Sequence, residues 1–422
     1  MCKEKRDEIK AEDILAKIER GEDVEFEDAI VTGDLNLSKH VERDDHELES
    51  SPKQVRSAIN IKNSIICESI NWSNLTFQKP VNVENSIFNR NVDFTNSKFK
   101  KQTNFYQVQF KKDAYFKGTE FGRCLLNEIY MISYQSNEKS KFGNNNFNIG
   151  VSFQFARFED DANFENSTFC CDVSFEGSKF RGDVAMFKNA KFKRDTNFGG
   201  ATFQRFANFE EAEFGDIARF NTTNFRADAM FKDATFGSSL ILFRARIDTI
   251  SLYSKFKSDI EIDLDEANFN RIYIDWKYFK KYLKLDEAVY IALVKCLKDQ
   301  GQYEDADDCY YDYREWRSRR KDLSLSAFYS DCFSWASCGY GVRLSHTIMC
   351  IIAIIAIFSP IYTGIDHPRL EYAYFSTMTF VGNIPDNFHP TGIFRIAAII
   401  ETILGYLLLP LFVVVLARKF IR

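Results

Sequence analysis

The sequence predicts a mixed fold, in which a β-solenoid of short repeats is followed by helices that end in a two-span membrane module. Three observations predict it. Phe is unusually frequent, with 42 copies in 422 residues. Apolar residues recur in alternating steps of five and six over much of the chain. Two almost uncharged stretches, each long enough to cross a bilayer, lie near the C-terminus.

Composition narrows the classes of function. The net charge of −5 gives no bulk attraction to nucleic acid, so no nucleic-acid partner is expected. The ten cysteines lack metal-ligand spacing, which is typical of reduced thiols in a cytosolic compartment. The chain has no phosphate loop, nucleophile elbow or HExxH motif. We therefore expect no enzyme activity, no catalytic residues, no cofactor and no bound metal.

The N-terminal domain, residues 1–30, is expected to be a cap helix. Apolar side chains within residues 7–20 fall near helical spacing, and Gly21 follows as a stop. These side chains are Ile9, Ile14, Leu15 and Ile18. Residues 34–37 then alternate like a strand, and the polar residues 38–57 are interpreted as a loop insertion.

A repeat with a period of eleven begins near residue 59. The series reaches Phe121, breaks between Gly122 and Asn146, resumes at Phe147, and gains one residue near Met186. A helix would place residues five and six apart on different sides of its axis, and a flat strand needs a period of two. The period instead predicts coils of short β-bridges and turns. Stacked coils would bury Phe on Phe in a central column.

Two segments of this repeat follow the pattern A-x-F-x-x-A-x-F, allowing Ser for the second Ala. They are residues 162–169 and 229–236. Over roughly residues 59–275 the chain resembles the pentapeptide-repeat family. The resemblance implies a right-handed, four-sided β-helix, here assigned to residues 31–275, that serves as a scaffold. The eleven-residue unit replaces two strict fives, which predicts coils of about 22 residues.

Helical sequence follows the repeats. Residues 276–323 predict a helical hairpin that caps the open end of the solenoid. Its acids Asp305, Asp307 and Asp308 lack the spacing of a calcium loop and are expected to form a solvated helix face. Residues 324–343 mix aromatic side chains with Ser and Cys. They predict either an interfacial helix on the inner leaflet or a surface helix packed on the hairpin.

The last domain, residues 344–422, contains two expected membrane spans. Leu344–Gly364 and Ile396–Leu416 are each long enough to cross about 30 Å of hydrocarbon. Lys and Arg gather before the first stretch and after the second, whereas the connecting loop holds only Arg369 and Arg395. The positive-inside rule therefore predicts a multi-pass protein of the cell membrane, with both termini and the solenoid in the cytoplasm.

A re-entrant segment is expected between the spans. Residues 371–380 are too short to cross a bilayer and too apolar for an ordinary exposed loop. The next residues, Val381–Pro385, are not helical in character. Because non-helical backbone at membrane depth is tolerated where it lines a water-filled path, the segment predicts the lining of a pore.

Residues 344–422 resemble the two-span potassium-channel-like family, on residues 374–379 as its pore helix and Gly405 as its hinge glycine. The resemblance implies roles for individual residues. The pore helix is expected to contribute Phe375, Ser376 and Thr377. The selectivity filter and pore are expected to contain Thr379, Phe380, Val381, Gly382, Asn383, Ile384 and Asp386.

The filter departs from the family pattern. The family reads T-V-G-Y-G, whereas residues 380–384 read F-V-G-N-I, without the second glycine. A stack of carbonyl rings needs glycines to turn the backbone. Potassium selectivity is therefore not expected to carry over, and a wider, less selective cation path or an altered filter is expected instead.

Several candidate residues have two interpretations. Asn383 and Asp386 either ring the outer mouth and attract cations or form a solvated turn. Glu401 either faces the pore, bonds the pore helix, or forms a structural pair with Arg395 or a hydroxyl group.

The inner helix and the connecting loop leave further alternatives open. Gly405 and Pro410 either kink the second span into a gate or cause a plain bend. His367 and His389 lack a third ligand, so no metal site is assigned to them.

These expectations combine into two hypotheses. The first is a homo-oligomeric ion channel subunit, tetrameric by family analogy, which is embedded in membrane lipid and conducts monovalent cations through its pore. Its cytoplasmic solenoid would regulate it or bind an unknown protein partner. The alternative is a membrane-anchored scaffold, whose solenoid binds a cytoplasmic partner while the spans only anchor it.

Overall fold

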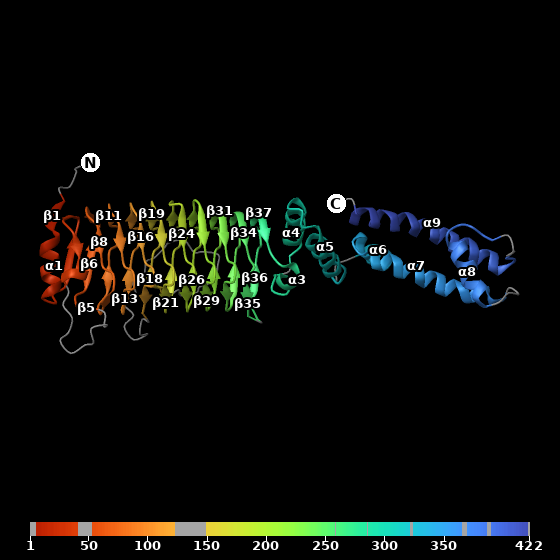
Figure 1. Cartoon of the computed structure of the whole chain (residues 1–422), viewed down its shortest axis with the longest axis horizontal. Coiled ribbons are helices and arrows are strands. Elements are labelled where there is room, and N and C mark those ends of the chain that lie inside the picture. The colour runs from red at the N-terminus through yellow and green to blue at the C-terminus, as the bar shows by residue number, and fades with distance from the viewer. Residues whose placement is uncertain are drawn as a thin grey trace. The chain divides into compact units, whose positions relative to one another are not determined.

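The computed structural model describes residues 6–40, 53–122, 149–257, 259–284, 286–320, 324–364, 369–385 and 390–420. The chain divides into two compact units, Met1–Val289 and Tyr290–Arg422. The first unit is a β-solenoid and the second is helical (Figure 1).

Four ladders of parallel strands build the solenoid, and two of them belong to one sheet. The first ladder of that sheet contains β3 (Ala29–Thr32), β7 (Ile65–Ile66), β11 (Ile87–Phe88), β15 (Gln109–Phe110), β19 (Arg157–Phe158), β23 (Lys179–Phe180), β27 (Thr202–Phe203), β31 (Asn224–Met230), β34 (Arg246–Ser251) and β37 (Asn268–Tyr273). The second contains β4 (Leu35–Asn36), β8 (Ile70–Asn71), β12 (Val92–Asp93), β16 (Ala114–Tyr115), β20 (Ala162–Asn163), β24 (Val184–Met186) and β28 (Phe206–Asn208), and then joins β31.

The other two ladders form separate sheets. The ten-stranded ladder contains β2 (Val24–Glu27), β6 (Ile59–Lys62), β10 (Val81–Asn82), β14 (Thr103–Asn104), β18 (Ile149–Ser152), β22 (Asp172–Ser174), β26 (Thr196–Asn197), β30 (Ala218–Arg219), β33 (Ser239–Ile241) and β36 (Glu261–Asp263). The nine-stranded ladder contains β5 (Lys53–Val55), β9 (Leu75–Phe77), β13 (Lys98–Phe99), β17 (Glu120–Phe121), β21 (Thr168–Phe169), β25 (Lys191–Phe192), β29 (Glu213–Phe214), β32 (Thr235–Phe236) and β35 (Lys255–Phe256). The solenoid therefore has four sides and about ten turns.

The register confirms the predicted coil length. Phe77 pairs with Phe99, and Phe88 with Phe110, in each case 22 residues further along the chain. Ala162 instead pairs with Ala185, so this coil contains one additional residue, close to the expected insertion near Met186.

Stacked phenylalanines fill the interior in several columns rather than the expected single central one. Phe175 is fully buried, and its ring stacks on Phe153 at 4.8 Å and on Phe198 at 4.7 Å between centroids. It also meets Phe164 of a neighbouring column edge-to-face at 5.3 Å. Each side of the coil supplies its own inward ring. Such stacked and edge-to-face pairs add about 0.5–1.5 kcal/mol each beyond the burial of their area.

Left-handed residues turn the chain at corresponding places in successive coils. Asn74 and Asn96 occupy one such position and Asn63 and Asn85 another, each with φ between +52° and +56°. Asn tolerates this conformation better than most residues. Phe155 has the same left-handed conformation, which is unusual for a bulky residue, and it is 47% exposed. Gly177 in the next coil makes room for it, because a Cβ there would lie 2.5 Å from the Phe155 ring.

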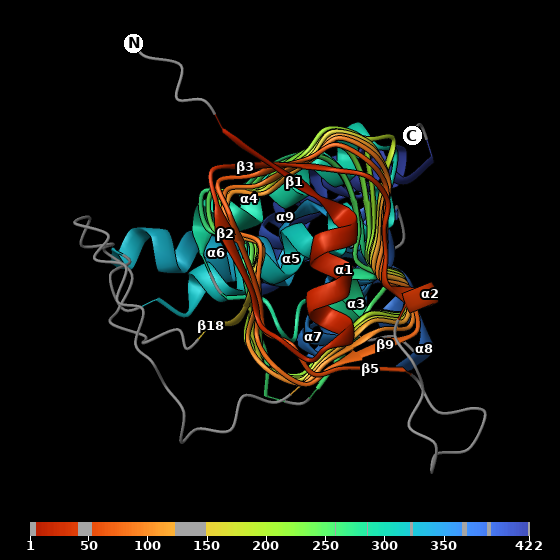
Figure 2. The same ribbon diagram turned by 90° about the vertical axis from the view of Figure 1, so that its left-hand side faces the viewer.

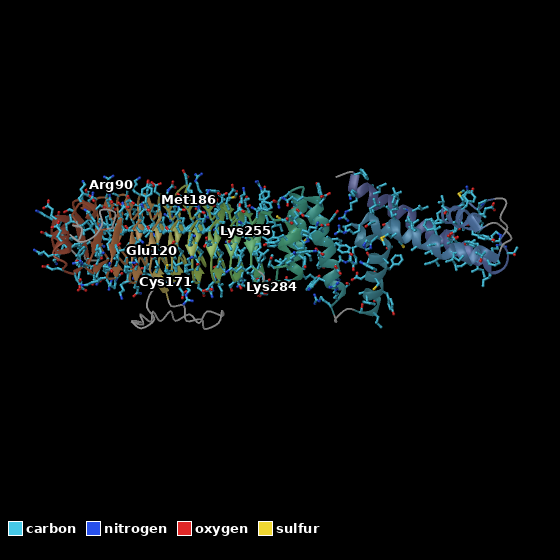
Figure 3. All side chains as sticks on the ribbon, turned by 60° about the horizontal axis from the view of Figure 1, so that its bottom comes forward. Arg90, Glu120, Cys171, Met186, Lys255 and Lys284 are labelled. Carbon is cyan, nitrogen blue, oxygen red and sulfur yellow. The ribbon has the colours of Figure 1, made fainter. Side chains whose placement is uncertain are left out.

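Charged side chains lie on the outside of the coils (Figure 3), and several of them pair between neighbouring turns. On the nine-stranded ladder Lys98 lies 3.1 Å from Glu120, and Lys191 lies 3.1 Å from Glu213. These pairs are largely exposed, and such pairs contribute about 0–1 kcal/mol each. They favour the register without determining the fold.

Helix α1 (Ala11–Glu19) lies across the N-terminal end of the solenoid (Figure 2). It buries Ile14, Leu15 and Ile18, as expected for a cap helix. The predicted helix nevertheless begins too early. Residues 7–10 instead form β1 (Asp7–Lys10), which pairs with β3. The hydrogen bonds of this pairing satisfy the backbone N–H and C=O groups that a helix would otherwise satisfy.

The polar segment predicted as a loop is only partly a loop. Its start lies in the short helix α2 (Leu37–His40), and its end forms β5, which pairs with β9. Residues 41–52 lie outside the described part of the chain.

The first helix of the predicted hairpin region closes the C-terminal end of the solenoid. In α3 (Trp276–Phe279), Trp276 and Phe279 are each 1% exposed, and Phe279 contacts Phe256 of the last coil. Leu283 adds a bridge to Ile262. Within the first unit, α3 and the segment after it provide the capping contacts, and the share of the remaining residues of the predicted hairpin, 276–323, in this cap stays a prediction.

The second unit begins within α4 (Glu287–Asp299) and continues with α5 (Tyr303–Ser318) and α6 (Leu325–Cys338). A short 3-10 turn, η1 (Gly339–Gly341), leads to α7 (Leu344–Phe358), which η2 (Ser359–Gly364) extends. Helices α8 (Arg369–Phe380) and α9 (Ile393–Phe420) complete the unit (Figure 1).

Helix α6 packs on the hairpin, as one interpretation of residues 324–343 predicts, while its placement on the inner leaflet stays a prediction. One face packs on α5, where Asp331 pairs with Arg314 at 2.5 Å. The other face exposes apolar side chains at helical spacing, namely Leu325, Phe328, Tyr329 and Phe333. The helix is therefore amphipathic, with an exposed aromatic face next to the start of α7.

Candidate functional site

Two helices of the second unit are long and apolar enough to cross a membrane. They are the segment Leu344–Thr363, of 20 residues, and α9, of 28 residues. Of the most apolar stretch of each helix, only 6% of the residues are buried in the first helix and 22% in the second. The core helix of a soluble protein would be mostly buried, so these exposed apolar faces favour contact with lipid.

Helix α8 lies between the two candidate spans and cannot cross a bilayer itself. Its 12 residues extend about 18 Å at 1.5 Å per residue, against about 30 Å of hydrocarbon. It buries Tyr372 and Phe375 against Tyr362 of η2 and Ala398 of α9. Tyr362 and Phe375 meet edge-to-face with centroids 4.7 Å apart. Helix α8 is thus a short helix packed against two span-length helices, and its re-entrant placement in a membrane stays a prediction.

Glu401 of α9 joins the elements of this module. Its side chain is fully buried. One carboxylate oxygen accepts a hydrogen bond from the Tyr362 hydroxyl at 2.7 Å, and the other accepts one from the Ser376 hydroxyl. Ser376 also contacts the carbonyl of Ile355 in α7 at 3.3 Å. Glu401 therefore bonds a Ser hydroxyl on the expected pore helix, which fits two of the alternatives left open by the sequence, a bond to that helix and a structural pair with a hydroxyl group.

The C-terminus of α8 contains the first residues of the predicted filter. Thr379 and Phe380 are the last residues of the helix and are buried. The amide of Gly382 donates to the carbonyl of Thr379 at 3.0 Å, and the amide of Asn383 donates to that of Met378 at 2.9 Å. With Gly382 at φ +84°, this is the left-handed helix cap known as a Schellman motif. The glycine is thus accounted for by the helix end.

The residues after the cap are available to solvent or to another chain. Val381, Gly382, Asn383 and Ile384 are all exposed. Thr377 is exposed as well, and its hydroxyl donates to the carbonyl of Ala373. Asp386, His367 and His389 lie outside the described residues. The assignment of residues 379–386 to an ion path stays a prediction.

Gly405 permits a close approach between α9 and the end of α8. A Cβ at this position would lie 1.7 Å from the carbonyl oxygen of Phe380. Thr402, one turn earlier, donates to the carbonyl of Thr379 at 3.1 Å. The role of Gly405 in this structure is therefore to allow close packing of the two helices, whereas its role as a hinge stays a prediction. Pro410 lies inside α9, which continues to Phe420.

Sequence reasoning missed the ion pairs that hold α5 to the candidate spans. Asp307 pairs with Arg418 of α9, and Asp308 with Arg343 just before α7, both at 2.8 Å. These acids were expected to form a solvated helix face. The signal available in the sequence was only indirect, in that basic residues gather at the ends of both spans.

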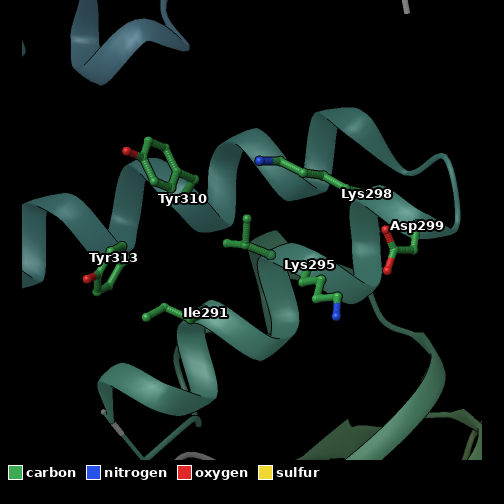
Figure 4. Close-up of a pocket in the computed structure, with 7 residues that line it drawn as sticks. Ile291, Lys295, Lys298, Asp299, Tyr310 and Tyr313 are labelled. Carbon is green, nitrogen blue, oxygen red and sulfur yellow. The ribbon is translucent and has the colours of Figure 1, made fainter.

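Helices α4 and α5 form a shallow groove between them. It has a volume of about 280 Å3 and is lined by Ile291, Val294, Lys295, Lys298, Asp299, Tyr310 and Tyr313. The ammonium group of Lys298 points toward Tyr310, whereas that of Lys295 points away from it (Figure 4). Because ligand sites need polar groups that converge, this groove is not a candidate site. Within the described ranges, no group of three or more His, Cys, Asp or Glu side chains is placed to hold a metal ion.

Comparison with known proteins bears on the solenoid. Residues 187–235 match the family model described as pentapeptide repeats (9 copies). No curated protein matches the chain. No solved structure matches it either. The chain therefore carries pentapeptide repeats in a β-solenoid, followed by a helical region with two candidate membrane helices.

Proposed function

We propose that the chain is one subunit of an oligomeric ion channel that conducts cations through an atypical filter. The observation that carries the proposal is α8, a helix too short to span, which packs between two span-length helices and ends in exposed, non-helical backbone. Irregular backbone of this kind is tolerated at membrane depth where it lines water. By analogy with the two-span family, several copies would surround one path.

The proposed topology places both termini and the solenoid in the cytoplasm. Arg317, Arg319 and Arg343 precede the first candidate span, and Arg418 and Lys419 end the second. The exposed aromatic face of α6 would then lie on the inner leaflet, where amphipathic rings settle. The solenoid would regulate the channel or bind a cytoplasmic protein.

Flux through liposomes tests the proposal. The full-length protein is reconstituted, and flux is measured under K⁺, Na⁺ and Cl⁻ gradients. Asn383→Cys is then treated with a positively charged thiosulfonate, with the treated wild type setting the background from native cysteines. If residues 381–384 line the path, the reagent should reduce cation flux toward that of empty liposomes.

Ile357→Cys is the matched control, because Ile357 lies on α7 with 64% of its side chain exposed and would face lipid. Its flux should not respond to the reagent. A membrane that stays sealed to every ion under voltage, tension and altered pH would overturn the channel proposal.

One observation favours the alternative of a membrane-anchored scaffold. The single acid in the candidate spans, Glu401, receives hydrogen bonds from two hydroxyl groups of its own chain and is not exposed. An anchor needs only such internal packing. Deleting the solenoid separates the two functions, because a channel would still conduct, whereas an anchor would leave the membrane sealed with or without the deletion.

A further inference from the structure

Helix α5 presents one continuous face to the candidate spans and to α6. Asp307, Asp308, Tyr311 and Arg314 follow one another at helical spacing along this face. The opposite stripe of α5, formed by Ala306, Cys309 and Tyr313, is buried within the hairpin, where Tyr313 contacts Tyr290 of α4. The helix is therefore held on both sides.

Three arginines connect this face to three different elements. Arg418, near the end of α9, donates to Asp307 at 2.8 Å and to the carbonyl of Gly341 at 3.3 Å. Arg343 pairs with Asp308 at 2.8 Å and lies over the Tyr311 ring at 4.8 Å. Arg314 of α5 itself pairs with Asp331 of α6. The ends of both candidate spans and the helix before them thus converge on α5.

The turn between α6 and α7 forms the centre of this contact. Gly339, Tyr340 and Gly341 are all left-handed, with φ of +51°, +59° and +77°. Such a conformation is strained for Tyr340, and it persists where surrounding contacts hold it. The Arg314 guanidinium lies 4.9 Å over the Tyr340 ring. Burial raises the pKa of the Tyr340 phenol above its ordinary value of 10, so the ring under the cation is neutral at pH 7.

Two of the three pairs, Asp307–Arg418 and Arg314–Asp331, contain a partly buried acid, which makes them stronger than ordinary surface pairs, whereas Asp308–Arg343 is more than a third exposed on both sides. The side chains of Asp307 and Asp331 are 16% and 11% exposed. Charge-assisted hydrogen bonds strengthen as water is excluded. Helix α5 also lies between the solenoid and α7 in the sequence, so the backbone that connects them runs through it. Both the chain itself and the lateral pairs therefore pass through α5.

We infer that α5 is a coupling helix, which holds the ends of both candidate spans through Asp307–Arg418 and Asp308–Arg343 and transmits displacement of the hairpin to α9. The meaning of this coupling as control of a gate rests on the proposed channel function. The coupling itself concerns only contacts between helices, so it can be tested whether or not the protein conducts.

Charge reversal tests the inference in the full-length protein in lipid nanodiscs. Asp307→Arg and Arg418→Asp are each expected to speed amide hydrogen exchange over residues 413–420 about tenfold, the loss expected for one charged hydrogen-bonded pair. The double variant re-forms the pair with reversed polarity and should return exchange close to the wild-type rate. Glu315→Arg is the control, because Glu315 pairs with Arg319, one turn away along the same chain segment.

The outcomes separate the coupling from the channel. Unchanged exchange in the single variants, or no rescue in the double variant, overturns the coupling helix. If the wild type conducts, the single variants should also alter flux and the double variant should restore it. Flux that stays unchanged in both single variants would overturn the control of a gate by α5, while the exchange measurements still decide the coupling itself. If the wild type conducts nothing, the channel proposal fails, and the exchange measurements alone decide the role of α5.

Discussion

In the solenoid, Phe175 stacks on Phe153 and Phe198, and equivalent rings repeat this arrangement from coil to coil. In the helical unit, Glu401 joins Tyr362 to Ser376 through an arrangement that occurs once among the residues that the structure describes. Contacts in the first unit are copies of a local pattern, while those in the second connect residues of unrelated sequence. This difference teaches where damage should spread. A lost solenoid contact leaves similar neighbours on both sides, whereas a lost helical contact has no substitute.

The largest effect should come from removing a ring inside the solenoid. Phe175→Ala deletes a fully buried side chain with partners above and below, and should cost about 3–5 kcal/mol of stability. Loss of the strand signal in circular dichroism on heating the full-length chain in detergent measures it.

Phe155→Ala is the matched control in the neighbouring coil, because that ring is half exposed and its backbone is left-handed. It should change the melting temperature little. Equal losses from the two variants would contradict the view that inward rings carry the stability of the solenoid.

A somewhat smaller effect is expected at the crossing of α8 and α9. Gly405→Ala places a Cβ against the carbonyl of Phe380, which should cost about 3 kcal/mol by forcing the helices apart. Limited proteolysis between residues 369 and 392 should become faster, while the solenoid melts as before.

Gly392→Ala provides the comparison for this variant. Gly392 is left-handed at φ +58°, and a Cβ there would meet nothing within 4 Å. Its cost should be limited to the backbone term, about 1–2 kcal/mol. If Gly405→Ala proved as mild as Gly392→Ala, the close contact would not exist in solution.

A smaller effect again is expected at the buried carboxylate. Glu401→Ala leaves the hydroxyls of Tyr362 and Ser376 without their acceptor, which should cost about 2 kcal/mol. Glu401→Gln keeps one acceptor oxygen and should cost less. Thermal unfolding of the helices in nanodiscs distinguishes the two.

A solenoid hydroxyl sharpens this comparison. Ser97 donates to the carbonyl of Trp72 in the preceding coil at 2.5 Å, and Ser97→Ala removes one donor of a repeated kind. It should cost about 1 kcal/mol. A Glu401→Ala loss no greater than this would weaken the claim that Glu401 is an irreplaceable junction.

The sequence was most informative where contacts are periodic. Ladder partners such as Phe88 and Phe110 lie one coil apart, so the spacing of Phe alone reveals both the coil and its length. The error at Ile9 has a simple cause, since residues 7–10 suit both a helix and a strand, and pairing with β3 decided between them.

The candidate site was less predictable for the opposite reason. Asp307 and Arg418 are 111 residues apart and form their pair once, so no spacing announces it. The cap at Gly382 could have been recognised, because Gly after a helix usually ends it. The resemblance to the channel family instead assigned Gly382 to the selectivity filter.

The 22-residue register has a consequence for how the chain could change in length. Removing residues 82–103 would delete one whole turn and join matching positions, and adding a turn would be equally simple. Each event would move the two ends of the rod by about 4.8 Å, the spacing between paired strands, and leave both end helices intact. A single added residue can be absorbed only locally, as at Val184–Met186. The length of the solenoid is therefore set in steps of one turn by the number of 22-residue coils in the sequence.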